Sequence, residues 1–454
     1  MITPLLFQSK FLVLGLLAGI TAIGLIMAPN RSRFLLALGT VTAAFQVEIL
    51  IAPLGAGFTF GYVAFLLLLI FSFIEKGTRT GRERHPIPRV VWPWLALLLC
   101  SLFAVTKAVD STVARGTIIL FGFDLIIFFA VLRTVRTPQD IRFFAGCLMA
   151  AIMVQSLIGL LQYKFPFFKI GVIDHFQSYM WWRSKGTFFH ANHFGMFLML
   201  LLPVTIRSVI SAIAEKNSPW VWYGFASAGI GFVALLASNN RGSWGGLTFG
   251  LLIMLAVDIF RRGTKIRRII TNLLAVALLV GGLLSIKFAP KIYDRVFADD
   301  AEGQLEGREL QMEETIPLVL ANPLIGVGYG NDRFYASVIF VHNAYMLIAA
   351  ETGIPGLLCF IWLLIEIFRE IWVVSRSGVL FCANYARGAL AALLGFCVAS
   401  WVGPDFWINF GVQSYFWLLV ALIFVVSRLR RTTFARQKQQ MRKQQTQAVA
   451  ATAN

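Results

Sequence analysis

The fold class is decided by residues 57–74, which read GFTFGYVAFLLLLIFSFI. The run carries no charged residue, and about 20 apolar residues in a helix cross the hydrocarbon core of a bilayer. Its hydrophobicity is continuous, whereas the strands of a membrane β-barrel alternate at period two. The stretch therefore predicts a transmembrane helix.

Similar runs recur along the chain, which is 58% hydrophobic and has a mean hydropathy of +0.75. They predict an all-α integral membrane protein with about 12–13 transmembrane helices. The apolar segments are 10–28, 34–52, 57–74, 91–106, 115–132, 142–162, 190–210, 221–237, 243–260, 269–287, 354–373, 384–402 and 409–427. Segment 34–52 contains Gln46 and Glu48, so we expect it to be broken or re-entrant.

The net charge of +18 reflects membrane topology rather than binding to nucleic acid. Basic residues gather in loops 75–90, 133–142 and 261–268 and in the tail from Arg428 to Lys443. Short loops rich in Lys and Arg stay in the cytoplasm. In a bacterium the chain would thus be a multi-pass inner-membrane protein with a cytoplasmic C-terminus. Alternation then predicts periplasmic positions for the loops 163–189, 238–242, 288–341 and 403–408.

The longest loop, 288–341, has nine acidic residues against four basic ones, the reverse of the cytoplasmic loops. We expect an amphipathic helix near 308–320 within it and an interfacial helix over 342–352. The predicted organisation is one transmembrane domain, 1–432, followed by a disordered basic cytoplasmic tail, 433–454.

No metal or cofactor site is expected. The five cysteines lie in apolar segments without the spacing of metal ligands, so they read as buried small side chains rather than disulfides. The glycine-rich run 322–330 lacks the Lys-Ser/Thr ending of a phosphate loop, which makes a nucleotide site improbable.

Two candidate clusters place cations on the periplasmic side, where topology does not require them. The first runs from Trp181 to His193 and includes Arg183, Lys185 and Asn192. Its alternative interpretation is a set of snorkelling cations in an aromatic belt. The second is the tight turn containing Asn240 and Arg241, whose glycines permit a close approach of backbone or ligand.

A third cluster follows from the large loop. It contains Arg308 and the run Val341-His342-Asn343-Ala344-Tyr345. Guanidinium groups bind phosphate oxygens in a fork, and a histidine titrates near ambient pH, which suits a general base. Together these residue types favour group transfer from a phosphorylated, lipid-linked donor.

The motifs resemble, in order, those of the O-antigen ligase / O-antigen polymerase family. They are Arg183-x-x-Gly186-Thr187-Phe188 with Asn192, Asn240-Arg241-Gly242, Gly307-Arg308 with Asn322-Pro323-Leu324-Ile325-Gly326-Val327-Gly328, and His342-Asn343-x-Tyr345 with Glu351-x-Gly353-x-x-Gly356. The resemblance covers about residues 140–375 in motif and the whole chain in layout.

The resemblance implies a metal-independent, inverting glycosyltransferase of the GT-C type. Its partners would be a glycan donor on undecaprenyl diphosphate, a lipid A–core or other glycan acceptor, and membrane lipids. Arg241 and Arg308 would bind the diphosphate, and Arg183 would be a further donor-site cation. His342 would serve as base for the acceptor hydroxyl or would orient it. The full candidate set is His342, Arg241 and Arg308 as catalytic residues, with Arg183, Lys185, Asn192, Asn240, Asn343 and Tyr345 in substrate binding.

Three alternatives stay open at this point. The chain could be a repeat-unit polymerase of the same family, for which the sequence offers no distinguishing mark. A secondary transporter or lipid flippase would use ionisable residues near mid-membrane, such as Glu48, Asp124 and Glu366, but these form no matched repeat. A structural scaffold leaves the periplasmic arginines unexplained.

Overall fold

The computed structural model describes Gly15 and residues 17–45, 48–51, 56–77, 87–165, 183–259, 300–335 and 341–452. The elements are a helix Leu17–Met27, α2 Arg31–Thr42, β1 Glu48–Ile51, β2 Ala56–Thr59, α3 Phe60–Gly77, α4 Val91–Ala104, η2 Val105–Lys107, α5 Ser111–Thr134, α6 Pro138–Lys164, α7 Ala191–Ala214, α8 Ser218–Ser238, α9 Arg241–Ile259, α11 Asp300–Ala321, η4 Asp332–Phe334, α12 Ala344–Ser375, α13 Leu380–Val402, α14 Asp405–Ile408 and α15 Phe410–Thr452.

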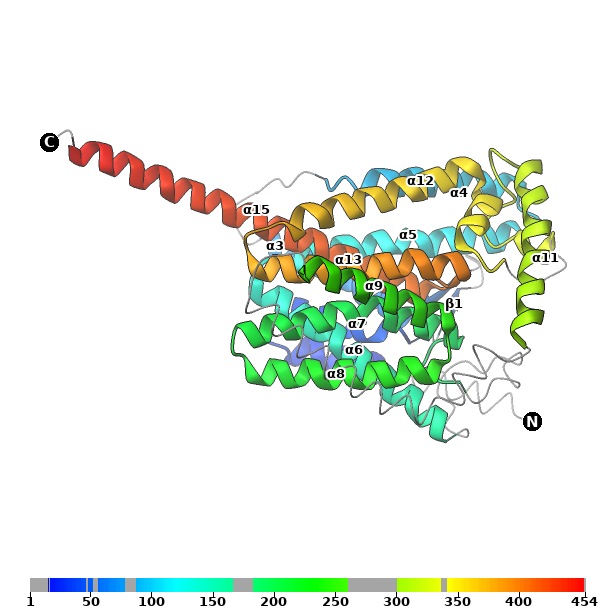
Figure 1. Ribbon diagram of the computed structural model, residues 1–454, viewed down its shortest axis with the longest axis horizontal. Helices are drawn as coiled ribbons and strands as arrows, with labels where there is room; N and C mark the ends of the chain where they lie inside the picture. Colours follow the sequence, from blue (N-terminus) through cyan, green and yellow to red (C-terminus); the bar gives the residue numbers. More distant parts are fainter. Residues whose placement is uncertain are drawn as a thin grey trace.

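The long helices lie side by side in a bundle, and α11 crosses one end of it (Figure 1). That end also holds the turn between α8 and α9 and the first residues of α7 and α12. We call it the site end. The C-terminal part of α15 projects from the opposite end (Figure 1).

Within the described residues, seven helices are long and apolar enough to cross a bilayer, which confirms an α-helical integral membrane protein. They are α5 to α9, Phe381–Val402 of α13 and Phe410–Thr433 of α15, beside shorter apolar helices at Leu17–Met27, Phe60–Ile74 and Val91–Lys107. The predicted span 269–287 lies outside the described residues, so the total of 12–13 stays a prediction.

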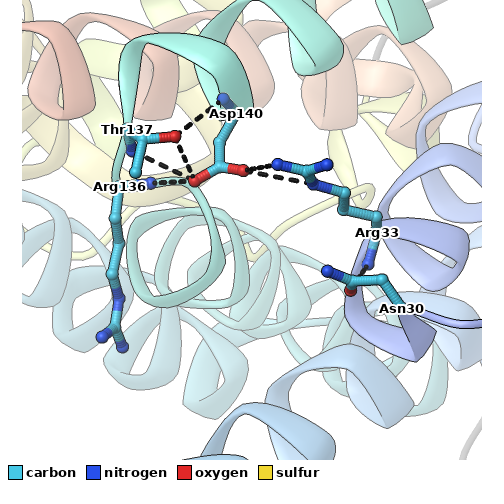
Figure 2. A network of polar contacts seen from close by, with 5 residues as sticks. All are labelled: Asn30, Arg33, Arg136, Thr137 and Asp140. Carbon is cyan, nitrogen blue, oxygen red and sulfur yellow. Dashed lines mark hydrogen bonds and ion pairs between the residues drawn. The ribbon is translucent and has the colours of Figure 1, made fainter.

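The opposite end is tied together by charged groups (Figure 2). Thr137 and Asp140 form a capping box at the start of α6, and Pro138 occupies its first turn. The Asp140 carboxylate also accepts two hydrogen bonds from Arg33 at the start of α2, 2.6 and 3.2 Å long. Arg33 and Arg136 therefore lie at one end of the bundle, as the basic-loop pattern predicts.

The expected break in segment 34–52 is confirmed. Helix α2 ends at Thr42, and the chain then forms an antiparallel hairpin in which Glu48 pairs with Thr59 and Ile51 with Ala56. The sequence explains the change, because Pro53 cannot continue a helix and the β-branched Ile49 and Ile51 favour a strand.

The helices in the C-terminal tail and in the loop 288–341 are longer than expected. Disorder was expected over 433–454, but α15 continues as a helix to Thr452. The Gln, Ala, Lys and Arg residues of the tail favour a helix, and neither Gly nor Pro interrupts them. The loop helix α11 begins at Asp300 and is longer than the expected 308–320.

Helix α12 is two helices joined by a kink rather than one span. Gly353 has φ 75° and ψ 173°, which is not helical, and Pro355 follows it. The segment before the kink, Ala344–Thr352, corresponds to the expected interfacial helix 342–352. The segment after it runs the length of the bundle to Ser375 (Figure 1).

The centre of the bundle is formed by α7, α9 and α13, which approach closely through small residues. Gly250 faces the backbone carbonyl of Ala391, and Gly246 faces that of Gly395. Towards the opposite end the same three helices share one carboxylate, Asp258, whose two oxygens contact Arg207 and Arg387.

Candidate functional site

Arg183 is almost fully buried at the site end, with 6% of its surface exposed. Its Nε donates to the carbonyl of Ser238 over 2.8 Å, and its Nη2 donates to Oδ1 of Asn192 over 2.6 Å. Two predicted site residues are therefore in direct contact. The guanidinium is fixed between the end of α8 and the start of α7.

The segment that carries Arg183 is itself held in place by polar side chains of α6. Gln155 donates to the Thr187 hydroxyl over 2.9 Å and accepts from its backbone N–H, while Gln162 donates to the Gly186 carbonyl over 2.8 Å. Gly186 adopts φ +59°, and a Cβ there would lie 2.6 Å from Gln155. Lys185 lies in this segment and is half-buried.

The turn between α8 and α9 places Asn240 beside Asn192. The Asn240 amide donates to the Asn192 backbone carbonyl over 2.9 Å and to the Ser243 hydroxyl over 2.8 Å. Its Oδ1 accepts the Ser243 N–H and so caps α9. Arg241 is the first residue of α9 and is half-buried. Arg183, Asn192 and Asn240 thus form one connected unit, with Arg241 directly after it.

A second polar group, absent from the predicted set, lies on the same side of α7. His193 is buried, its Nδ1 is 2.9 Å from the Asn409 amide, and its Nε2 is 3.6 Å from Oδ1 of Asp405. Burial raises the pKa of Asp405 to about 7, and the nearby charge of Arg183 opposes that shift. A carboxyl that titrates near neutrality therefore lies close to the arginine unit.

His342 lies at the other side of the site end, on the segment that leads into α12. Its ring Nδ1 is 2.9 Å from Oε1 of Gln311 on α11, and its backbone N–H donates to the same oxygen over 3.1 Å. The imidazole is exposed while Gln311 is buried. The backbone of Arg308 lies one turn earlier on α11, and its side chain falls outside the described part of the chain.

Asn343 and Tyr345 fix the start of α12. The Asn343 side chain caps the helix by accepting the N–H groups of Tyr345 and Met346. The Tyr345 hydroxyl donates to the carbonyl of Cys397 on α13 over 3.2 Å, and its ring packs near Trp401. Asn343 therefore serves as a helix cap, whereas the neighbouring imidazole of His342 faces solvent.

Helices α13 and α14 lie between the two groups of candidate residues. Tyr345 reaches α13 from the α12 side, and Gly242 at the start of α9 packs against Val402 near the end of α13. Asp405 follows three residues later on α14. All the predicted residues therefore lie at one end of the bundle, and the α13–α14 connection is common to both groups.

The glycine-rich run 322–330 wraps around the beginning of α12 and packs there. Backbone N–H groups of Val327 and Gly328 donate to the carbonyls of Ala350 and Glu351, and Ile354 donates to Pro323. A Cβ at Gly326 would lie 2.4 Å from the Glu351 backbone. The glycines thus serve close packing against the kinked helix, in line with the absence of a phosphate-loop signature.

Several further buried residues make polar contacts at the site end and were not in the predicted set, namely His193, Gln311, Asp332, Glu351, Asp405, Trp407 and Asn409. Glu351 was part of a quoted motif without a role. A signal was present for the acids, because an ionisable residue within or beside an apolar run is costly and marks function. His193 carried the same signal, because it lies near the start of the apolar helix α7.

These features define a multi-pass α-helical membrane protein with a polar, cation-containing site at one end of the bundle. Residues 226–361 match the family model described as O-Antigen ligase. This match confirms the resemblance to the O-antigen ligase / O-antigen polymerase family, and the stretch includes Asn240, Arg241, Arg308, His342, Asn343 and Tyr345. It supports glycan transfer of the ligase or polymerase type. No curated protein matches the chain.

Proposed function

We propose that the chain transfers a glycan from a polyprenyl diphosphate to an acceptor hydroxyl at the site end, as an O-antigen ligase does. The observation that carries this proposal is the arginine unit at the start of α7 and α9. Arg183 and Arg241 lie beside two helix N-termini, whose N–H groups and dipoles favour anions. A diphosphate is the anion that the reaction class offers.

At the anomeric carbon the proposed reaction breaks one bond and forms one, and the proton of the acceptor O–H passes to a base. The acceptor oxygen attacks the anomeric carbon while the bond from that carbon to the diphosphate oxygen breaks, so the configuration inverts. The electron pair leaves with the diphosphate, whose growing charge Arg183, Arg241 and Arg308 would stabilise. One lost contact of this kind costs about 2–4 kcal/mol in barrier.

His342 is the proposed acceptor of the hydroxyl proton. A base that hydrogen-bonds through Nδ1 to Gln311 presents Nε2 outwards, and the exposed ring is accessible to a substrate. An amide oxygen as the partner of Nδ1 favours the tautomer in which Nδ1 carries the proton and Nε2 is the basic nitrogen.

Three substitutions test the proposal, namely Arg241→Ala, Arg308→Ala and His342→Ala. Each should abolish the surface glycan in a complementation assay while the protein still inserts into the membrane. Arg115→Ala is a matched control, because this exposed arginine at the site end bonds only to Ser111 of its own helix in the described structure. Normal glycan in all three variants would refute the proposed enzyme activity.

Electrophoresis of the glycans from a deletion strain separates a ligase from a polymerase. Accumulation of long polyprenyl-linked chains in the deletion strain indicates a ligase, and accumulation of single repeat units indicates a polymerase. A transporter or flippase would instead leave the lipid-linked donor on the cytoplasmic face of the membrane.

A further inference from the structure

Glu351 is a buried acid whose two oxygens are both occupied by N–H donors. It lies two residues before the kink in α12 and has 1% of its surface exposed. Its Oε1 accepts the N–H of Gly330 over 2.7 Å, and its Oε2 accepts the indole N–H of Trp407 on α14. One side chain therefore joins the glycine-rich run, α12 and α14.

A second buried acid, Asp332, hydrogen-bonds to Glu351 through its carboxyl group. It is 4% exposed, and no N–H or hydroxyl donor reaches its Oδ2. Two ionised carboxylates are acceptors only and cannot bond to each other, so one of the pair carries a proton. The pair therefore holds one proton between its two carboxyl groups.

We propose that Glu351 and Asp332 share one proton. This proton latches residues 322–332, which are the glycine-rich run and the two residues after it, onto the beginning of α12. The inference rests on the proposed function in one respect only. The latch would hold the segment that leads into His342 and Asn343, which makes Glu351 and Asp332 positioning residues for the transfer.

Aromatic and amide contacts surround the latch and keep water from it. The Tyr329 ring stacks on Trp407 with centroids 4.4 Å apart, and its hydroxyl donates to the Trp407 carbonyl over 2.6 Å. Gln413 donates to the same carbonyl over 2.9 Å. Asn331 joins the run to the start of α5, accepting the Asp110 N–H over 2.7 Å. The run is thus anchored on three sides, with the carboxyl pair at the centre.

The charged and titratable groups around the pair are few. Tyr329 faces Glu351, Arg333 attracts Asp332, and Asp124 of α5 and Tyr62 of α3 lie behind Tyr329. Burial raises the pKa of both carboxyls in the pair above their ordinary values of 3.8 and 4.5. The charge of Asp332 raises the pKa of Glu351 further, whereas the hydrogen bond with Glu351 lowers that of Asp332. The pKa of Tyr329 is also raised, so its hydroxyl stays neutral.

The sign of the pH dependence follows from proton counting. The closed latch holds one proton that the open, solvated carboxyls release above about pH 4.5. Closure is therefore most favourable in acid and weakens as pH rises towards the raised pKa of the pair. Within that window the equilibrium between open and closed forms shifts about tenfold per pH unit for one proton.

Hydrogen exchange on the full-length protein in lipid nanodiscs tests the latch directly. In the wild type, protection of the amides in 328–332, corrected for intrinsic exchange, should fall several-fold to tenfold per unit between pH 6 and 8. In Asp332→Asn an amide N–H replaces the shared proton, so Glu351 stays ionised with three N–H donors and protection should not depend on pH. Protection that falls equally in both proteins, or in neither, overturns the proposal.

Glu351→Gln provides the second variant, in case the first alters the run in another way. A glutamine cannot accept both the Gly330 and the Trp407 N–H, so protection of 328–332 should drop at least tenfold at every pH. Unchanged protection would contradict the latch. Amides in the middle of α7, away from the run, are the internal control for global unfolding.

A glycan-transfer assay across the same pH range adds the functional readout. The Asp332→Asn variant should retain transfer at the alkaline end, where the wild type loses it. If neither protein transfers glycan at any pH, the proposed function fails while the exchange data still decide the latch. If exchange behaves as expected but the two transfer profiles coincide, the pair does not position the site.

Discussion

The side chain of Asn192 accepts a 2.6 Å hydrogen bond from Arg183, and its backbone carbonyl accepts one of 2.9 Å from Asn240. One residue at the start of α7 therefore orients a cation from the preceding loop and the turn that carries Arg241. It links the two clusters that the sequence shows as separate motifs.

Removal of that link should impair transfer more than folding. In Asn192→Ala the buried Arg183 loses a hydrogen bond to a charged group, worth about 1.5–3 kcal/mol. If that bond orients the guanidinium for the donor, initial transfer rates in membranes should drop about 10- to 150-fold. Asn217→Ala is the matched control, because Asn217 caps α8 at the opposite end. Its loss should cost about 1 kcal/mol of stability and leave transfer intact. Equal loss of transfer in both variants would contradict an orienting role.

Asp405 should make thermal stability depend on pH. Its folded pKa of about 7 is raised above the ordinary 3.8, so its stabilising effect is complete below about pH 4 and is lost as pH rises through 7. The difference amounts to something on the order of 4 kcal/mol. Asp405→Asn should flatten the fall in unfolding temperature between pH 5 and 8, without removing the part due to Glu351 and Asp332. An unchanged slope would show that Asp405 is ionised throughout.

Gly326 should not tolerate a side chain. Its φ is +74°, and a Cβ would overlap the Glu351 backbone at 2.4 Å. Gly326→Ala should lower stability by about 1–3 kcal/mol for the backbone strain alone, and more for the overlap. Gly378→Ala, at a position with open space around it, should be neutral. Differential scanning fluorimetry in detergent makes the comparison, and matching melting curves would refute the packing role of the run.

Asp258 should be required for a stable bundle. It is the shared carboxylate of Arg207 and Arg387, and all three side chains are buried. Asp258→Asn leaves two buried guanidinium groups without their counter-ion, at a cost of about 3–5 kcal/mol. Protein yield and detergent stability should fall sharply. Glu366→Gln, which affects a half-buried acid on α12, should be close to neutral. Equal stability of the two variants would show that the Asp258 cluster contributes little.

The sequence was sufficient for the transmembrane character and for the set of motifs. Apolar length is a local property, so the apolar helix over 60–74 could be predicted without a structure, although residues 57–59 belong to strand β2. The hairpin after Thr42 was harder, because a strand of four residues between apolar runs has the composition of a buried helix. The tail to Thr452 was misjudged because high polarity outweighed its helix-favouring residues.

The contacts within the site were beyond the sequence. Arg183 and Ser238 are far apart along the chain, and only the packing of α6, α7 and α8 brings them together. The same holds for Trp407 and Glu351, which meet because α12 kinks at Gly353. A motif indicates which residues matter for a family, but not that Asn343 caps a helix while His342 faces solvent.

The C-terminal end of α11 bears on which acceptor hydroxyls can reach His342. Leu320 and Leu324 expose 69% and 74% of their surface, and the chain there is hydrogen-bonded to Ile354, which begins the lipid-facing side of α12. Leucines exposed in this way would insert among acyl chains and would fix the depth of α11 in the bilayer. Because the imidazole of His342 contacts Gln311 on the same helix, such an anchor would hold it at a constant height above the hydrocarbon. An acceptor hydroxyl would then be selected by how far its own anchor lifts it from the membrane, and a thicker or thinner bilayer would change which hydroxyl is within reach.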